Sequence, residues 1–116
     1  MTRDELRAAL AGFPPGSRED AAARGVFVAR IDAWPSDTSP AAQLVDDLDR
    51  ILGNVWFSEP ATHERVGRAI EAFAATVRQI GGMTMNERLF VLGLVDLWDT
   101  SSEQERAALR SKVSGS

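Results

Sequence analysis

The residue types that most often carry enzyme chemistry are scarce in this chain. His63 is the only histidine, and cysteine and tyrosine are absent, so a nucleophile would have to be a serine or a threonine. None of these hydroxyl residues stands in a nucleophile-elbow sequence. A lone histidine in the first turn of a helix is typical of an exposed surface position. We therefore assign no catalytic residue from the sequence.

Metal and cofactor sites also lack their characteristic spacings. The Glu-x-x-His pair of di-iron helical bundles does not occur around His63. Three neighbouring carboxylates would suit a hard cation, namely Asp46, Asp47 and Asp49. However, the loop glycine and the downstream glutamate of an EF-hand are missing from this stretch. We expect no metal and no cofactor.

The acidic residues are concentrated in the segment 31–60. This segment holds six carboxylates and only one arginine, whereas the chain as a whole has a net charge of −4. The same segment contains three aromatic residues, and protein interfaces favour aromatic anchors within a charged rim. We expect a basic protein partner to bind at Trp34, Asp37, Asp46, Asp47, Asp49, Trp56, Phe57 and Glu59. The alternative is that both tryptophans fold inward and close the ends of a helical bundle.

A second candidate site lies in the apolar segment 85–99. Asp96 stands between Val95 and Leu97, and a carboxylate in such surroundings must pair, reach water or change its pKa. On a helical wheel, Arg88, Asp96 and Asp99 share one narrow strip. The alternative site is therefore a polar notch formed by Arg88, Asp96 and Asp99, which could hold a small molecule or support catalysis. A salt bridge from Asp96 to an arginine is the purely structural explanation.

Charge and hydropathy exclude several other functions. The 17 acidic residues outnumber the 13 basic ones, so nucleic acid should on average be repelled. No run approaches the roughly 18 apolar residues of a membrane span, and the N-terminal residues do not resemble a targeting signal. We expect a cytoplasmic protein that binds neither nucleic acid nor a membrane.

The elements that must position these residues are helices. Capping-box and proline signals predict helix starts near residues 3, 18, 40, 60, 85 and 102, and glycine pairs or prolines mark several of the stops. The clearest stripe lies in 60–80, where apolar residues recur at steps of four and three. The segment 26–34 fits either a helix or a strand, because its apolar residues satisfy both periods.

These elements predict an all-α protein. With 116 residues, the chain is long enough for one core, so we expect a single domain over 1–116 with a frayed tail at 114–116. The segment 85–99 is apolar nearly all round, which is typical of a helix at the centre of a fold. We therefore expect an irregular bundle of five to six helices around this central helix, rather than an up-and-down four-helix bundle.

One stretch resembles a known sequence pattern. Residues 84–99 read TMNERLFVLGLVDLWD. They resemble the Asn-Glu-Arg-Leu-Phe, Gly-Leu and Asp pattern of a group of small bacterial proteins that has no assigned activity. The resemblance implies a bacterial origin and transfers no functional residue.

Together these observations favour a non-enzymatic function. The primary hypothesis is a small acidic helical module that binds a basic protein, in its narrower form an inhibitor or immunity protein that imitates a polyanion. One alternative is a ligand-binding or catalytic bundle that uses the polar notch. Another is a homodimeric structural protein joined through Trp34, Trp56 and Phe57.

Overall fold

The computed structural model describes residues 1–114, and all of the regular structure within them is helical. The prediction of an all-α protein is confirmed. The segment 26–34, which also fitted a strand, lies mainly in the second helix. The α-helices are α1 (Arg3–Gly12), α2 (Arg18–Ala33), α3 (Ala41–Asn54), α4 (Pro60–Arg78), α5 (Met85–Val91), α6 (Val95–Thr100) and α7 (Glu103–Lys112). Short 3-10 turns follow α2 and α4 at Trp34–Ser36 and Ile80–Gly82.

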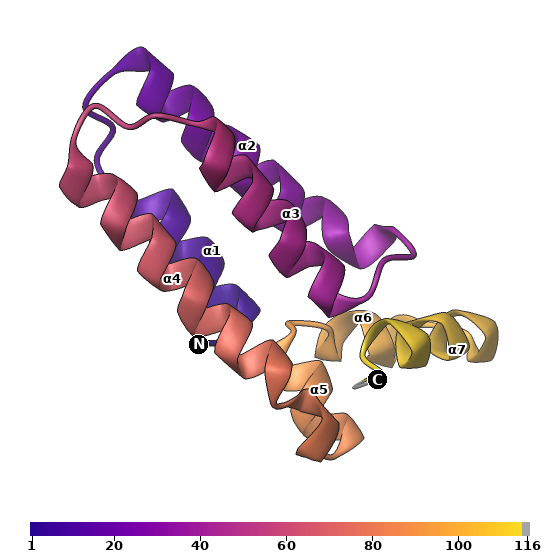
Figure 1. Ribbon diagram of the computed structural model, residues 1–116. Helices are drawn as coiled ribbons and strands as arrows, with labels where there is room; N and C mark the ends of the chain where they lie inside the picture. Colours follow the sequence, from indigo (N-terminus) through magenta and orange to yellow (C-terminus); the bar gives the residue numbers. More distant parts are fainter. Residues whose placement is uncertain (115–116) are drawn as a thin grey trace.

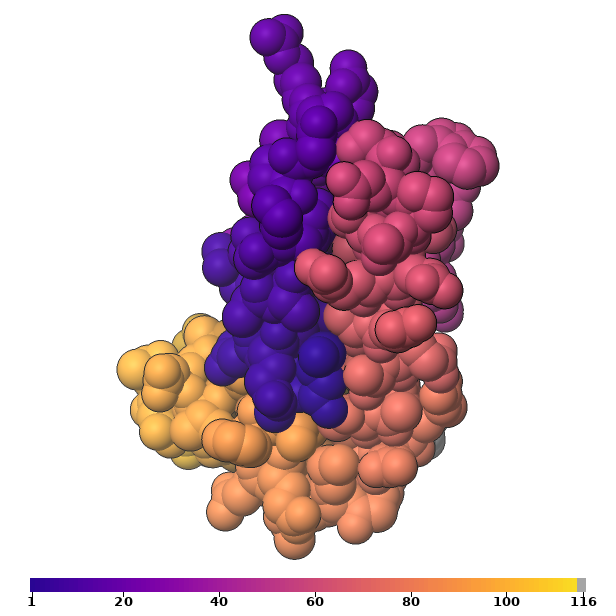
Figure 2. All heavy atoms as spheres, turned by 90° about the vertical axis from the view of Figure 1, so that its left-hand side faces the viewer, coloured from indigo at the N-terminus to yellow at the C-terminus, as the bar shows by residue number. Residues whose placement is uncertain are grey.

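The first four helices form an antiparallel bundle. Each of α1, α2 and α3 packs against the next helix, and α4 closes the ring on α1 (Figure 1). Figure 2 shows α1 and α4 meeting along their length. The short connectors between successive helices favour this antiparallel order. The prediction of a helical bundle is confirmed, but its arrangement around a central helix at 85–99 is corrected, because these four helices bury their apolar faces mainly against one another.

The apolar stripes of these helices supply most of the core. In α4 the predicted residues Val66, Ile70, Phe73 and Val77 are all buried. In α2, Phe27 and Ile31 are fully buried although the helix as a whole is not strongly amphipathic. Alanines and exposed apolar residues dilute the stripe of α2, which explains why the sequence alone left its type open.

The segment 85–99 is two helices rather than one. Gly93 has a φ of 69°, in the left-handed region, and it separates α5 from α6. The amide of Leu94 donates to the carbonyl of Leu89 at 2.8 Å, and the amide of Gly93 donates to that of Phe90 at 3.1 Å. These two bonds are the Schellman motif that ends a helix at a glycine. Leu92 and Leu94 remain buried beside the break.

This segment does not lie at the centre of the fold either. The helices α5, α6 and α7 lie across one end of the four-helix bundle (Figure 1). Only one face of α5 is buried, and Phe90 on another face is 66% exposed. Val95 and Leu97 of α6 are also exposed. The expectation of a helix buried all round is therefore wrong. The turn at Gly93 divides the segment into two short helices, and each of them packs against the rest of the protein on one side only.

A buried arginine holds the turn at Gly93 against the bundle. The guanidinium of Arg3 donates to the carbonyls of Ile31, Leu92 and Gly93 at 3.1 to 3.4 Å. Burial lowers the pKa of Arg3, although nearby carboxylates act in the opposite direction. Arg3 therefore connects α1, the end of α2 and the α5–α6 turn, and each carbonyl it contacts gains a charge-assisted hydrogen bond.

The last helix returns to the bundle end. Leu109 and Val113 are buried, and Arg88 donates to the carbonyl of Val113. Ser114, placed by prediction in a frayed tail, donates its amide to the carbonyl of Ser111 at 3.3 Å. The rest of that predicted tail, 115–116, lies outside the described residues. Within the described part of the chain, no helix combines the length and hydropathy needed to cross a membrane.

The turn at Gly93 gives a test of the fold. A Cβ at this position would lie 2.6 Å from Arg3 Nη1 and 3.0 Å from Asp4 Oδ1, and its backbone is strained for any L side chain. We expect Gly93→Ala to lower the free energy of unfolding by about 1–3 kcal/mol, measured by urea denaturation.

Gly25→Ala is the matched control, because Gly25 lies inside α2 and a Cβ there would meet nothing within 4 Å. This control should raise the free energy of unfolding by about 0.5–1 kcal/mol. Equal effects of the two substitutions would contradict the role assigned to Gly93.

Candidate functional site

The connector between α3 and α4 presents one tryptophan to solvent. It lies at the end of the bundle opposite α5, α6 and α7 (Figure 1). Trp56 is 87% exposed, the highest value among the large apolar side chains of the described residues. The next residue, Phe57, is buried. The backbone therefore directs two adjacent aromatic side chains to opposite environments.

Phe57 is held in an aromatic cluster. Its ring centroid lies 5.4 Å from that of Phe13 in an edge-to-face arrangement and 6.4 Å from that of Phe27 in a stacked one. The ring of His63 meets it edge-on at 5.9 Å. These are favourable geometries for aromatic pairs. The prediction that Phe57 contacts a partner is therefore corrected: its ring joins the core, and it brings His63 against the cluster.

The buried carboxylate of Asp20 fixes Ser58, the residue that follows Phe57. Asp20, only 1% exposed, accepts hydrogen bonds from the amide of Ser58 at 2.9 Å and from its hydroxyl at 2.6 Å. It also accepts one from the amide of Gly16 at 2.9 Å. The bond from the Ser58 hydroxyl contributes most to a lowered pKa of Asp20. Phe57 and Ser58 are thus both fixed, and the connector presents Trp56 from a defined backbone.

The sequence placed Asp20 only in the first turn of a helix. This position does favour a carboxylate, and Ser17 caps the same turn. No local pattern indicates that Ser58, 38 positions away, supplies two of the hydrogen bonds. The hydrogen bonds between Asp20 and Ser58 could therefore not be predicted, because they are a tertiary contact.

Trp34 lies at the other end of the bundle and is 0% exposed. Its Nε1 donates to the carbonyl of Ser39 at 3.1 Å. Two cations lie over its ring, with Lys112 Nζ at 4.3 Å and the Arg3 guanidinium carbon at 5.8 Å from the centroid. The prediction that Trp34 contacts a partner is thus wrong, and the inward alternative holds for Trp34 although not for Trp56.

Two of the predicted partner-binding carboxylates are neutralised within the fold. Asp37 Oδ1 accepts from Lys112 Nζ at 2.8 Å, and its Oδ2 accepts from Arg30 Nη1 at 2.8 Å. Arg30 also donates through Nε to Asp47 at 2.8 Å. Asp37 and Asp47 therefore form an internal ion network between α2, α3 and α7.

The network changes the acidity of its members. Burial would raise the pKa of Asp37, but hydrogen bonds from Lys112, Ser39 and Arg30 outweigh it and hold that pKa well below its usual range. Burial lowers the pKa of Lys112, and the neighbouring Asp37 opposes this shift. Asp37 is consequently ionised in the folded protein at neutral pH.

The remaining predicted carboxylates are available to a partner. Asp46, Asp49 and Glu59 are exposed, and within residues 1–114 they form no ion pair. Asp46 and Asp49 lie on α3, the helix that leads into the connector. The accessible predicted residues are therefore Trp56 and Glu59 on the connector, with Asp46 and Asp49 further back on α3. We call these four residues the Trp56 surface.

The predicted polar notch does not form. Arg88 is turned away from α6 and donates to the carbonyls of Gly81, Met83 and Val113 at 3.1 to 3.3 Å. Asp96 and Asp99 are exposed on α6 rather than enclosed. The helical wheel that joined these residues assumed one continuous helix, and the turn at Gly93 removes that premise.

Within the described part of the chain, no three histidine, cysteine, aspartate or glutamate side chains gather as metal ligands would. No known protein family, curated protein sequence or solved structure matches this chain. The resemblance of residues 84–99 to a group of small bacterial proteins stays a prediction.

The ion network predicts a pH-dependent stability. We expect Asp37→Asn to lower the free energy of unfolding at neutral pH by about 2 kcal/mol, because Lys112 and Arg30 lose a shared counter-charge that is itself partly exposed. The unfolded-state pKa of an aspartate is about 3.9. Because the folded-state pKa is lower, this stabilisation is present above the unfolded value and is lost as the pH falls through the folded one.

Urea unfolding measured from neutral pH down to about pH 2.5 tests this expectation. The difference between the wild type and Asp37→Asn should shrink below about pH 4. Asp46→Asn is the control, since Asp46 is exposed on α3 and forms no ion pair among the described residues. Parallel curves for the wild type and Asp37→Asn would contradict the network.

Proposed function

We propose that this chain is a non-enzymatic protein-interaction module that binds a basic protein through the Trp56 surface. The observation that carries the proposal is the 87% exposure of Trp56 on a connector whose next two residues are fixed. In a cytoplasmic bacterial setting, the narrower form is an inhibitor or immunity protein for a basic enzyme. Neither nucleic acid nor a membrane is a partner in this proposal.

The exposed indole supports the proposal through its binding energetics. Tryptophan is among the residues that contribute most at protein interfaces, because it buries a large area with few rotatable bonds. Phe57 and Ser58 already order the connector, so a partner does not bear the entropy cost of ordering this backbone. An indole presented in this way favours a partner with a complementary apolar pocket.

The exposed carboxylates on α3 and on the connector support a basic partner. Asp46, Asp49 and Glu59 keep their negative charge uncompensated among the described residues, whereas Asp37 and Asp47 do not. Uncompensated charges at the rim of an interface accelerate association with an oppositely charged protein and depend strongly on salt. The anchor would thus supply affinity and the carboxylates would supply the rate of association.

The homodimer hypothesis loses most of its contact residues. Trp34 and Phe57 are buried, so only Trp56 of the three proposed aromatic contacts is available to a second copy. Two copies meeting there would also bring their own carboxylates together. We therefore favour a different, basic protein over self-association.

The test places a photo-crosslinking amino acid at position 56 in the source cell, with position 90 as the control. Phe90 is a second exposed aromatic, and it belongs to α5, which lies at the opposite end of the molecule (Figure 1). We expect a basic protein to be linked at position 56 only. With this protein purified, Trp56→Ala should weaken binding by about 10- to 100-fold.

A matched pair of charge reversals tests the electrostatic part. Asp46→Lys/Asp49→Lys should slow association several-fold at low salt, whereas Asp96→Lys/Asp99→Lys changes the net charge equally at the far end and should have a smaller effect. Stopped-flow fluorescence measures both rates.

Equal crosslinking at the two positions, an acidic captured protein, or unchanged affinity in Trp56→Ala would contradict the proposal.

A further inference from the structure

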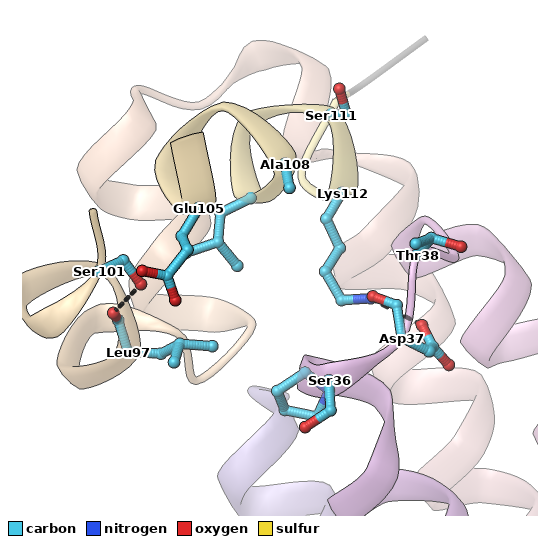
Figure 3. Close-up of a pocket in the computed structure, with 11 residues that line it drawn as sticks. Ser36, Asp37, Thr38, Leu97, Ser101, Glu105, Ala108, Ser111 and Lys112 are labelled. Carbon is cyan, nitrogen blue, oxygen red and sulfur yellow. Dashed lines mark hydrogen bonds and ion pairs between the residues drawn. The ribbon is translucent and has the colours of Figure 1, made fainter. Parts of the chain in front are cut away.

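A cleft separates the C-terminal helices from the connector between α2 and α3 (Figure 3). Its volume is about 560 Å³, within the range of small-molecule sites. Pro35 forms part of one wall, and Leu97, Ala108 and Leu109 form an apolar part of the other. The cleft therefore offers hydrocarbon contacts on two sides.

The ion pair between the buried Lys112 and the partly exposed Asp37 in the cleft wall offers no free charge to a ligand. Lys112 Nζ donates to the carbonyls of Asp37 and Ser39 and to Asp37 Oδ1, all at 2.8 to 2.9 Å. These three bonds use every proton of the ammonium group. Asp37 in turn pairs with two cations, Lys112 and Arg30. The charges of this pair are therefore compensated within the protein, and the unpaired charge of the cleft must come from another residue.

Glu105 supplies that charge. Its Oε1 accepts from the amide of Ser102 at 2.9 Å, which completes the capping box of α7. Within residues 1–114 it forms no ion pair, because Arg110 pairs with Glu103 and Arg106 donates to the carbonyl of Trp98. Both arginines also lie over the ring of Trp98 and outside the cleft. The charge that lines the cleft without a partner is consequently negative.

We propose that this cleft binds a small organic amine whose ammonium group pairs with Glu105. The apolar body of the amine lies on Leu97, Ala108 and Pro35, which the same cleft presents. An anionic ligand of the same shape meets the unpaired carboxylate and is rejected. This site is at the end of the molecule opposite the Trp56 surface and does not depend on the function proposed above.

Three ligands with one skeleton test the proposal: phenylbutylamine, phenylbutanol and phenylbutyrate. The measurement is a titration of the amide resonances of the isotope-labelled protein at low ionic strength. We expect saturable shifts with the amine, centred on Leu97, Ser101 and Ala108. The alcohol should bind about fivefold more weakly, and the carboxylate more weakly still.

Two variants locate the charge. Glu105→Gln keeps the capping-box acceptor and removes the charge, so α7 should still form while the affinity for the amine falls about fivefold. This loss should shrink as salt is added. Glu103→Gln, in the same first turn but outside the cleft, should leave the affinity unchanged. Ala108→Trp fills the cleft and should abolish binding of the amine and the alcohol with an unchanged circular dichroism spectrum.

The proposal fails on any of four results. These are equal affinity for the amine and the carboxylate, an unchanged affinity in Glu105→Gln, shifts centred away from the cleft, and no saturable shift up to about 10 mM amine. If Ala108→Trp does not fold, Glu105→Gln and its control still decide the question.

Discussion

Two buried cations, Arg3 and Lys112, both lie against the buried indole of Trp34. They determine how the four-helix bundle meets the C-terminal helices. Arg3 joins the bundle to the α5–α6 turn, and Lys112 joins α7 to the connector between α2 and α3. Removing an ion from water is costly unless its hydrogen bonds are replaced. Within the described residues, no buried side-chain nitrogen or oxygen lacks a hydrogen-bond partner. The arrangement of the C-terminal helices follows from this requirement.

The two ends of the bundle solve the same packing problem differently. At one end, the cations, Trp34 and three short helices cover the core, and the cleft forms where α6 and α7 meet the connector. At the other end, Phe57 and the Asp20–Ser58 hydrogen bonds cover the core without any further helix. Covering the core with Phe57 leaves its neighbour Trp56 in solvent. Both candidate binding regions are thus consequences of how a bundle end is closed.

Local sequence signals predicted the elements well. Thr2, Thr84 and Ser102 all form the capping boxes expected from their spacing, and the stripe of α4 is buried as its period indicated. Gly93 ends α5 in the left-handed conformation, and the apolar run around it obscured this break. The partners of Arg3, Asp20 and Lys112 were not predictable, because each is distant in sequence and carries no local pattern. Composition likewise could not separate the buried Trp34 from the exposed Trp56.

Lys112 is the only lysine among thirteen basic residues, and its side chain is 3% exposed. Acylation, ubiquitin-type conjugation and aldehyde damage all require a free side-chain amine with a lone pair. Here that amine is protonated, enclosed and bonded to three oxygens. The folded chain is therefore refractory to lysine modification, and the amine becomes reactive only when α7 detaches. Chemical labelling of this single position would report the opening of one specific interface.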